Sequence, residues 1–103
     1  MSFYKCTNLK IVKDLPNIHI SDTCFWGCFM ECTSIEQMPY MPSTDLDNLC
    51  YGYMFQRTGL RTLTNLPAKN VAEGAYSGMF SYCNNLTETI PISCDYIWDN
   101  GCY

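Results

Sequence analysis

The sequence has few charged residues, a single histidine and no long apolar run. Charged residues make up 16% of the 103 residues and hydrophobic residues 48%, which is too apolar for a disordered chain. No stretch approaches the roughly 20 apolar residues that cross a membrane, and the N-terminal residues do not resemble a signal peptide. We therefore expect one folded domain that stays in the cytoplasm. A domain excised from a secreted protein would look the same.

The charge is low and unevenly distributed. The net charge is −4 and the isoelectric point about 4.6, so the chain gains nothing from counterion release on nucleic acid and is repelled by anionic lipid. These properties exclude nucleic-acid and membrane partners and leave protein partners, particularly basic ones. Residues 1–20 have a net charge of +2 and residues 70–103 of −4, which favours end-to-end association of copies into a homo-oligomer.

Several residue types recur at nearly constant spacing. Phenylalanines recur at steps of 26, 26 and 25 residues, at Phe3, Phe29, Phe55 and Phe80. An apolar residue followed by proline recurs in register with them, at 15–16, 41–42, 66–67 and 90–91. Such a period is typical of repeat proteins. It predicts a single domain, 1–103, of four units at about 3–28, 29–54, 55–79 and 80–103.

Each unit has the pattern of a short strand, a proline-containing loop and a short helix or turn. Leu9, Ile35, Leu60 and Leu86 are the expected buried residues of the strands. The proline ends each strand, and Ser, Thr and Asp residues at 21–23 and 43–45 are suited to cap a short helix. One unit cannot bury its own apolar face, whereas stacked units share a core. We therefore predict an α/β repeat solenoid, a short leucine-rich-repeat stack.

The pattern Met-Phe-x-x-Cys-x-x-Leu, then Leu-Pro, then Cys-Tyr resembles the BspA-type leucine-rich repeats of bacterial, phage and protozoan proteins. The best-matching segments are residues 53–55 with Leu66 and Pro67, and residues 78–86. The resemblance covers essentially the whole chain. It implies a leucine-rich-repeat fold and, as in most members of the family, a role in adhesion or recognition. This chain differs from the family in having only four units and no export signal.

Eight cysteines are present, which is a high count for this length. They would predict a disulfide framework in a secreted domain, but without a signal peptide we expect buried free thiols. Cys24, Cys28 and Cys32 have the four-residue spacing that would align three thiols on a helix. Zinc sites usually contain a Cys-x-x-Cys pair, which the sequence lacks, so we expect no metal and no cofactor.

Nothing in the sequence indicates an enzyme. The single histidine, His19, lies in the loop after the first proline, and a catalytic role would need a partner residue held beside it. The sequence contains no recognised nucleophile motif and no glycine-rich phosphate loop. We expect His19 to be a solvent-facing or packed loop residue.

The residues beside the strand leucines are the expected binding surface, because solenoids use such variable rows for protein contacts. Tyr40, placed just after a strand, is the aromatic residue most expected to be exposed. The predicted protein-binding residues are Lys10, Glu36, Arg61, Thr87, Gln37, Thr62, Glu88 and Tyr40. The sequence therefore predicts a non-enzymatic protein-binding module, with a small bacterial or phage-encoded inhibitor that occludes its partner as a concrete version. The alternative is an excised repeat segment of a bacterial surface adhesin.

Overall fold

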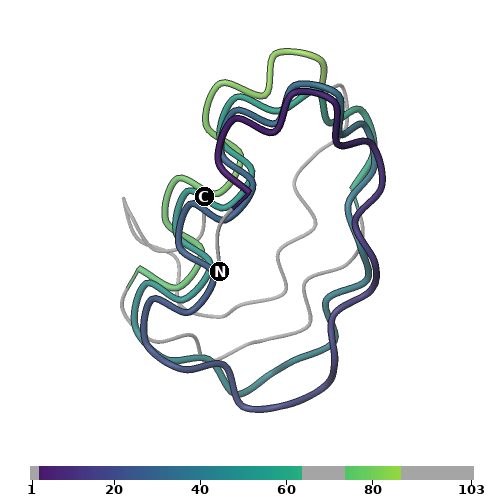
Figure 1. The fold of residues 1–103 in the computed structure, drawn as a ribbon. Helices are drawn as coiled ribbons and strands as arrows, with labels where there is room; N and C mark the ends of the chain where they lie inside the picture. The colour runs from purple at the N-terminus through teal and green to yellow at the C-terminus, as the bar shows by residue number, and fades with distance from the viewer. Residues whose placement is uncertain (1–2, 64–73, 87–103) are drawn as a thin grey trace.

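The computed structural model describes residues 3–63 and 74–86. In this part the chain follows similar paths in successive coils, which lie on one another (Figure 1). We refer to residues 3–28 as the first coil, 29–54 as the second, 55–63 with 74–79 as the third, and 80–86 as the fourth. Backbone hydrogen bonds join neighbouring coils: the Phe25 N–H donates to the Cys50 carbonyl at 2.8 Å, and the Tyr51 N–H to the Ala75 carbonyl at 2.9 Å.

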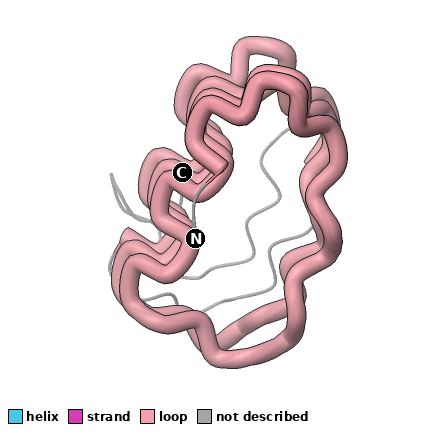
Figure 2. The backbone as a smooth tube through the Cα atoms, viewed as in Figure 1, coloured by secondary structure: helices cyan, strands magenta, loops and turns pink. Residues whose placement is uncertain are grey.

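The predicted α/β leucine-rich-repeat solenoid is wrong. The described residues form no helix, and their strand pairing is limited to two isolated parallel bridges, Ile20 with Leu46 and Gln37 with Thr62. Figure 2 shows loops and turns throughout the described chain. The molecule measures 33 × 28 × 20 Å along its principal axes, so it is compact. No helix in the described segments has the length and apolar character that spanning a membrane requires.

The segment expected to contain a capped helix is a series of consecutive β-turns. In residues 21–32, every second N–H donates to the carbonyl three residues before it, as Cys24 does to Ser21 and Cys28 does to Phe25. The alternate N–H groups, including those of Phe25 and Gly27, donate to the second coil instead. An α-helix uses nearly all its N–H groups within the segment. The turns leave half of them for the neighbouring coil, and this is why no helix forms.

The turns depend on left-handed backbone conformations that recur every four residues. The φ angles of Thr23, Gly27 and Glu31 are +54°, +60° and +61°, at the third position of the turns that begin at residues 21, 25 and 29, as in type II turns. Equivalent positions in the neighbouring coils have the same sign of φ. A left-handed residue interrupts any right-handed helix. The non-glycine residues in this conformation are Lys5, Thr23, Glu31, Leu49, Tyr53, Arg57 and Tyr82.

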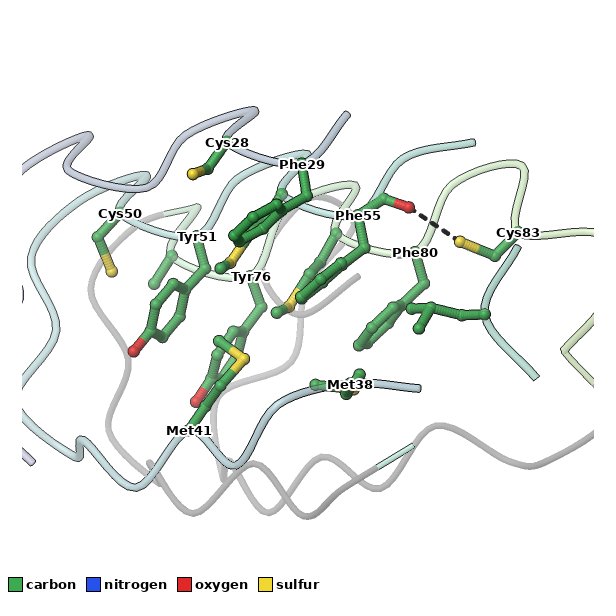
Figure 3. Packing of buried hydrophobic residues seen from close by; sticks show 14 of the residues in the cluster. Cys28, Phe29, Met38, Met41, Cys50, Tyr51, Phe55, Tyr76, Phe80 and Cys83 are labelled. Carbon is green, nitrogen blue, oxygen red and sulfur yellow. Dashed lines mark hydrogen bonds between the residues drawn. The ribbon is translucent and has the colours of Figure 1, made fainter. Parts of the chain in front are cut away.

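The core lies inside the coils and is organised in files of similar side chains (Figure 3). The phenylalanine rings of successive coils stack with centroids 5.4, 5.6 and 6.4 Å apart and interplanar angles of 7°, 12° and 8°, in the order Phe3, Phe29, Phe55 and Phe80. A second file joins Phe25, Tyr51 and Tyr76 at 5.9 Å per step. Stacked rings combine apolar burial with favourable ring geometry.

Two expectations about burial in the extended part are confirmed. Ile35 and Leu60 have no exposed surface, and Leu9 and Leu86 are partly buried against the same core. The side chains that follow them along the chain, including Lys10, Glu36 and Arg61, are exposed. The sequence therefore predicted the inward and outward positions of this segment, although the segment does not form a regular sheet.

Candidate functional site

Three of the predicted binding residues come from successive coils and lie beside one another. Lys10, Glu36 and Arg61 are exposed members of the first, second and third coils. The Arg61 N–H donates to the Glu36 carbonyl at 2.9 Å, and the Arg61 Nε lies 3.5 Å from Glu36 Oε2. Lys10 and Glu36 line the same hollow. The stacking of the coils thus brings together side chains that are far apart in the sequence.

The second predicted row has a similar arrangement. Gln37 and Thr62 are joined by a parallel backbone bridge, and both are exposed. Thr87 and Glu88, which were predicted to continue the two rows, lie outside the described residues. The described part of the surface therefore extends over three coils.

A hollow of about 590 Å³ opens between the first two coils on this surface. Its apolar lining includes Met38, which is 7% exposed, and Ile11, which is 82% exposed. Its full lining is Lys10, Ile11, Val12, Asp14, Thr33, Ser34, Glu36, Gln37, Met38 and Pro39. The surface of the hollow is thus mostly polar, with a smaller apolar part.

Tyr40 directly follows Pro39, and its N–H and carbonyl groups are both hydrogen-bonded to the first coil. Its N–H donates to Asp14 Oδ1 at 2.8 Å, and its carbonyl accepts from the Leu15 N–H at 2.9 Å. Its neighbour Pro39 lines the hollow together with Asp14. The side chain itself is 54% exposed, so an aromatic residue is presented to solvent on a fixed backbone.

Asp14 is a site residue that sequence reasoning missed. Its carboxylate both lines the hollow and fixes the backbone of Tyr40. The available signal was its position directly before the recurring apolar-proline pair at 15–16. Tyr40 precedes the second such pair in the same way, so the period of 26 residues places Asp14 beside Tyr40 in the neighbouring coil.

His19 bridges two carboxylates of the second coil. Its Nδ1 lies 2.8 Å from Asp45 Oδ2, and its Nε2 lies 3.1 Å from Asp47 Oδ2. The hydrogen bonds to Asp45 and Asp47 raise the pKa of His19 above its ordinary value. Both ring nitrogens are engaged, so in this arrangement neither is open to a substrate. His19 therefore links the first coil to the second at the protein surface.

The six cysteines among the described residues are free thiols: Cys6, Cys24, Cys28, Cys32, Cys50 and Cys83. The Cys32 thiol donates to the Phe3 carbonyl at 2.9 Å and the Cys83 thiol to the Phe55 carbonyl at 3.0 Å. Burial raises the pKa of Cys50 to about 12. No group of histidine, cysteine or carboxylate residues suited to hold a metal ion occurs in the part of the chain that the structure describes.

Comparison of this chain with protein-family models, curated proteins and solved structures finds no match. The similarity to BspA-type repeats therefore remains a prediction from the sequence pattern. Inferences about function depend on the chemistry of the surface described above.

Proposed function

We propose that this chain is a non-enzymatic binding module that holds a partner protein on the surface formed by Lys10, Glu36, Gln37, Tyr40, Arg61 and Thr62. The observation that carries the proposal is the hollow between the first two coils together with the exposed Tyr40, whose backbone is bonded to Asp14 of the hollow's lining. Tyrosine and arginine are enriched among the residues that dominate binding energy at protein interfaces. Here the two types occur on one surface with this hollow.

The rigidity of this surface favours binding. A partner does not have to order the backbone of Tyr40, because Asp14 and Leu15 already hold it. Ordering of loops and side chains is one of the main costs of association. The tyrosine ring itself has few rotatable bonds for the contact area that it provides.

The charged side chains of the surface would set specificity more than affinity. Glu36 and Arg61 are both exposed, and an exposed ion pair contributes only about 0–1 kcal/mol. The pair can therefore exchange partners with charges on another protein at little cost. The net charge of −4 for the whole chain favours approach of a basic partner.

The proposal is tested by comparing two variants in capture experiments from cells in which the protein occurs. Tyr40→Ala removes the exposed aromatic residue next to Pro39 of the hollow, and Tyr82→Ala removes a similarly exposed tyrosine that lines a different hollow. The captured protein is then purified and its affinity measured by calorimetry. We expect Tyr40→Ala to weaken binding about 30-fold, as for a hot-spot residue, and Tyr82→Ala to leave the affinity unchanged. Equal binding by wild type and Tyr40→Ala would refute the assignment of the surface.

The inhibitor version of the proposal adds a requirement. Saturating the captured partner with the wild-type chain should abolish the activity of the partner, whereas Tyr40→Ala at the same concentration should not. A partner that keeps full activity in the complex would limit the function to binding.

A further inference from the structure

Two cysteines lie in register in the first two coils. Cys6 and Cys32 are one period apart in the sequence, and the backbone beside them is hydrogen-bonded, since the Lys5 N–H donates to the Met30 carbonyl at 3.0 Å. Chains paired in this way lie about 4.8 Å apart. Cysteines joined by a disulfide have Cα atoms about 4.4–6.8 Å apart. The stacking of the coils therefore provides the backbone spacing that a disulfide needs.

The thiol of Cys32 points toward Cys6. The Cys32 Sγ donates to the Phe3 carbonyl at 2.9 Å, and the Cys6 N–H donates to the same oxygen at 3.0 Å. The sulfur of the second coil and the backbone nitrogen of Cys6 are thus both bonded to one atom. The Cys32 sulfur therefore lies directly beside the backbone of Cys6.

The third and fourth coils repeat this arrangement with a threonine in the position of Cys6. The Cys83 Sγ donates to the Phe55 carbonyl at 3.0 Å (Figure 3), and the Thr58 N–H donates to the same oxygen at 3.2 Å. There the Thr58 Oγ1 lies 3.4 Å from the Cys83 Sγ. A Cys6 side chain in the rotamer of Thr58 would place its sulfur at a similar distance from the Cys32 sulfur. The two sulfur atoms can therefore meet through a side-chain rotation and a small adjustment of the backbone.

We propose that Cys6 and Cys32 form a modification site that reacts with a small disulfide such as oxidised glutathione and closes a bridge between the first two coils. First, the Cys6 thiolate attacks one sulfur of oxidised glutathione, breaks its S–S bond and releases one reduced glutathione. The Cys32 thiolate then attacks the Cys6 sulfur, breaks the mixed disulfide and releases a second reduced glutathione. The two cysteines lose two electrons and two protons, and the glutathione disulfide gains them.

Exposure assigns a different step to each cysteine. Cys6 is exposed and Cys32 is buried, so a dissolved disulfide meets Cys6 first. Burial raises the pKa of Cys32, so this residue stays a thiol until the sulfur of a modified Cys6 is held beside it. The bridge is independent of the proposed function, because neither cysteine lines the hollow between the first two coils.

A second pair of cysteines has the same register and provides a comparison. Cys24 and Cys50 are also one period apart, and Cys24 is exposed while Cys50 is buried. Burial raises the pKa of Cys50 to about 12, and only the thiolate attacks a disulfide. We therefore expect the bridge between Cys6 and Cys32 to form before one between Cys24 and Cys50.

The test is equilibration of the reduced full chain with mixtures of reduced and oxidised glutathione, followed by alkylation, digestion without reduction and mass spectrometry. We expect a linked pair of peptides that contain Cys6 and Cys32, at glutathione ratios that leave Cys50 reduced. Because the fold already holds the two cysteines together, the equilibrium constant for this bridge should be about 100-fold larger than in the same chain unfolded in urea. Equal constants in the two states would overturn the proposal.

Two variants at exposed positions separate the bridge from general oxidation. The bridge should raise the melting temperature of the wild type by roughly 10 °C or more. Cys6→Ser should abolish this rise and leave Cys32 reduced, whereas Cys24→Ser, at the other exposed cysteine of the first coil, should keep both the bridge and the rise. Glutathione that stays on Cys6 of the wild type would overturn the proposal. Preferential linkage of Cys6 to another cysteine, including one of a second copy, would also overturn it.

Discussion

Replacement of Phe55 tests how far stacked rings stabilise the coils. Its ring lies between Phe29, at 5.6 Å, and Phe80, at 6.4 Å, and has no exposed surface. Phe3, at the beginning of the described file, stacks on Phe29 at 5.4 Å and is partly exposed. Phe55→Ala and Phe3→Ala therefore remove the same side chain from the middle and from the first described member of one file.

The expected magnitudes follow from burial and from the number of stacked neighbours. Truncation of a buried phenylalanine to alanine costs about 3–5 kcal/mol, including the cavity that it leaves. A folded domain has a total stability of about 5–15 kcal/mol, so Phe55→Ala should remove a substantial fraction of it. Phe55→Leu keeps most of the volume and loses two ring pairs of about 0.5–1.5 kcal/mol each. Phe3→Ala should cost less than half as much as Phe55→Ala, because its ring is partly solvated and has one ring neighbour among the described residues.

The free energy of unfolding is measured by urea titration, with tryptophan fluorescence as the signal; Trp26, one of the two tryptophans, lies against Tyr53. We expect Phe55→Ala to lose the most stability. Phe55→Leu should lose less, and Phe3→Ala should lose no more than Phe55→Leu. A Phe3→Ala variant as destabilised as Phe55→Ala would refute the reasoning, because the position in the file would then have no effect.

Three further predictions follow from burial and charge. Leu60→Ala should lower the free energy of unfolding by about 2–5 kcal/mol, whereas the neighbouring Arg61→Ala should be nearly neutral; equal losses in the same urea titration would mean that the inward and outward positions are wrongly assigned. The pKa of His19 is raised in the folded protein, so the stabilisation by the protonated His19 is complete below its ordinary pKa of 6.5 and disappears as the pH rises through the raised pKa. His19→Gln should remove this part of the pH dependence of the free energy of unfolding. An unchanged pH dependence would contradict the bridge. Because burial raises the pKa of Cys50 to about 12 while Cys24 is exposed, iodoacetamide at pH 8 should modify Cys24 in the folded protein and leave Cys50 intact, as mass spectrometry of the digested protein would show.

Part of the site could be predicted because it depends on spacing alone. Residues with the same position in the period lie in neighbouring coils, so the exposed positions of Lys10, Glu36 and Arg61 follow from the buried leucines beside them. Asp14 and Tyr40 are also one period apart, so the spacing places them in neighbouring coils. Only the tertiary structure shows that the Asp14 carboxylate accepts a hydrogen bond from the Tyr40 N–H.

The helix was predicted wrongly because a spacing of four residues is ambiguous. Cys24, Cys28 and Cys32 would align on one face of an α-helix, whose period is 3.6 residues, and they also align in consecutive turns that repeat every four residues. The left-handed φ angles that distinguish the two structures occur at residues such as Glu31 and Arg57. These residue types rarely adopt this conformation, so at their positions the sequence contains no signal for it; only Gly27, Gly74 and Gly78 are of a type that favours it.

The sequence by itself determined which side chains can stack, because the spacing of its phenylalanines and leucines places like residues in register. The tertiary structure decided how the backbone between them is hydrogen-bonded. Each turn gives half of its N–H groups to the neighbouring coil, and that choice exists only when a second coil lies beside the first. The same holds for the contact of His19 with Asp47. Asp45 lies one period after His19, but Asp47 lies 28 residues after it, so this second contact depends on how the coils lie against one another.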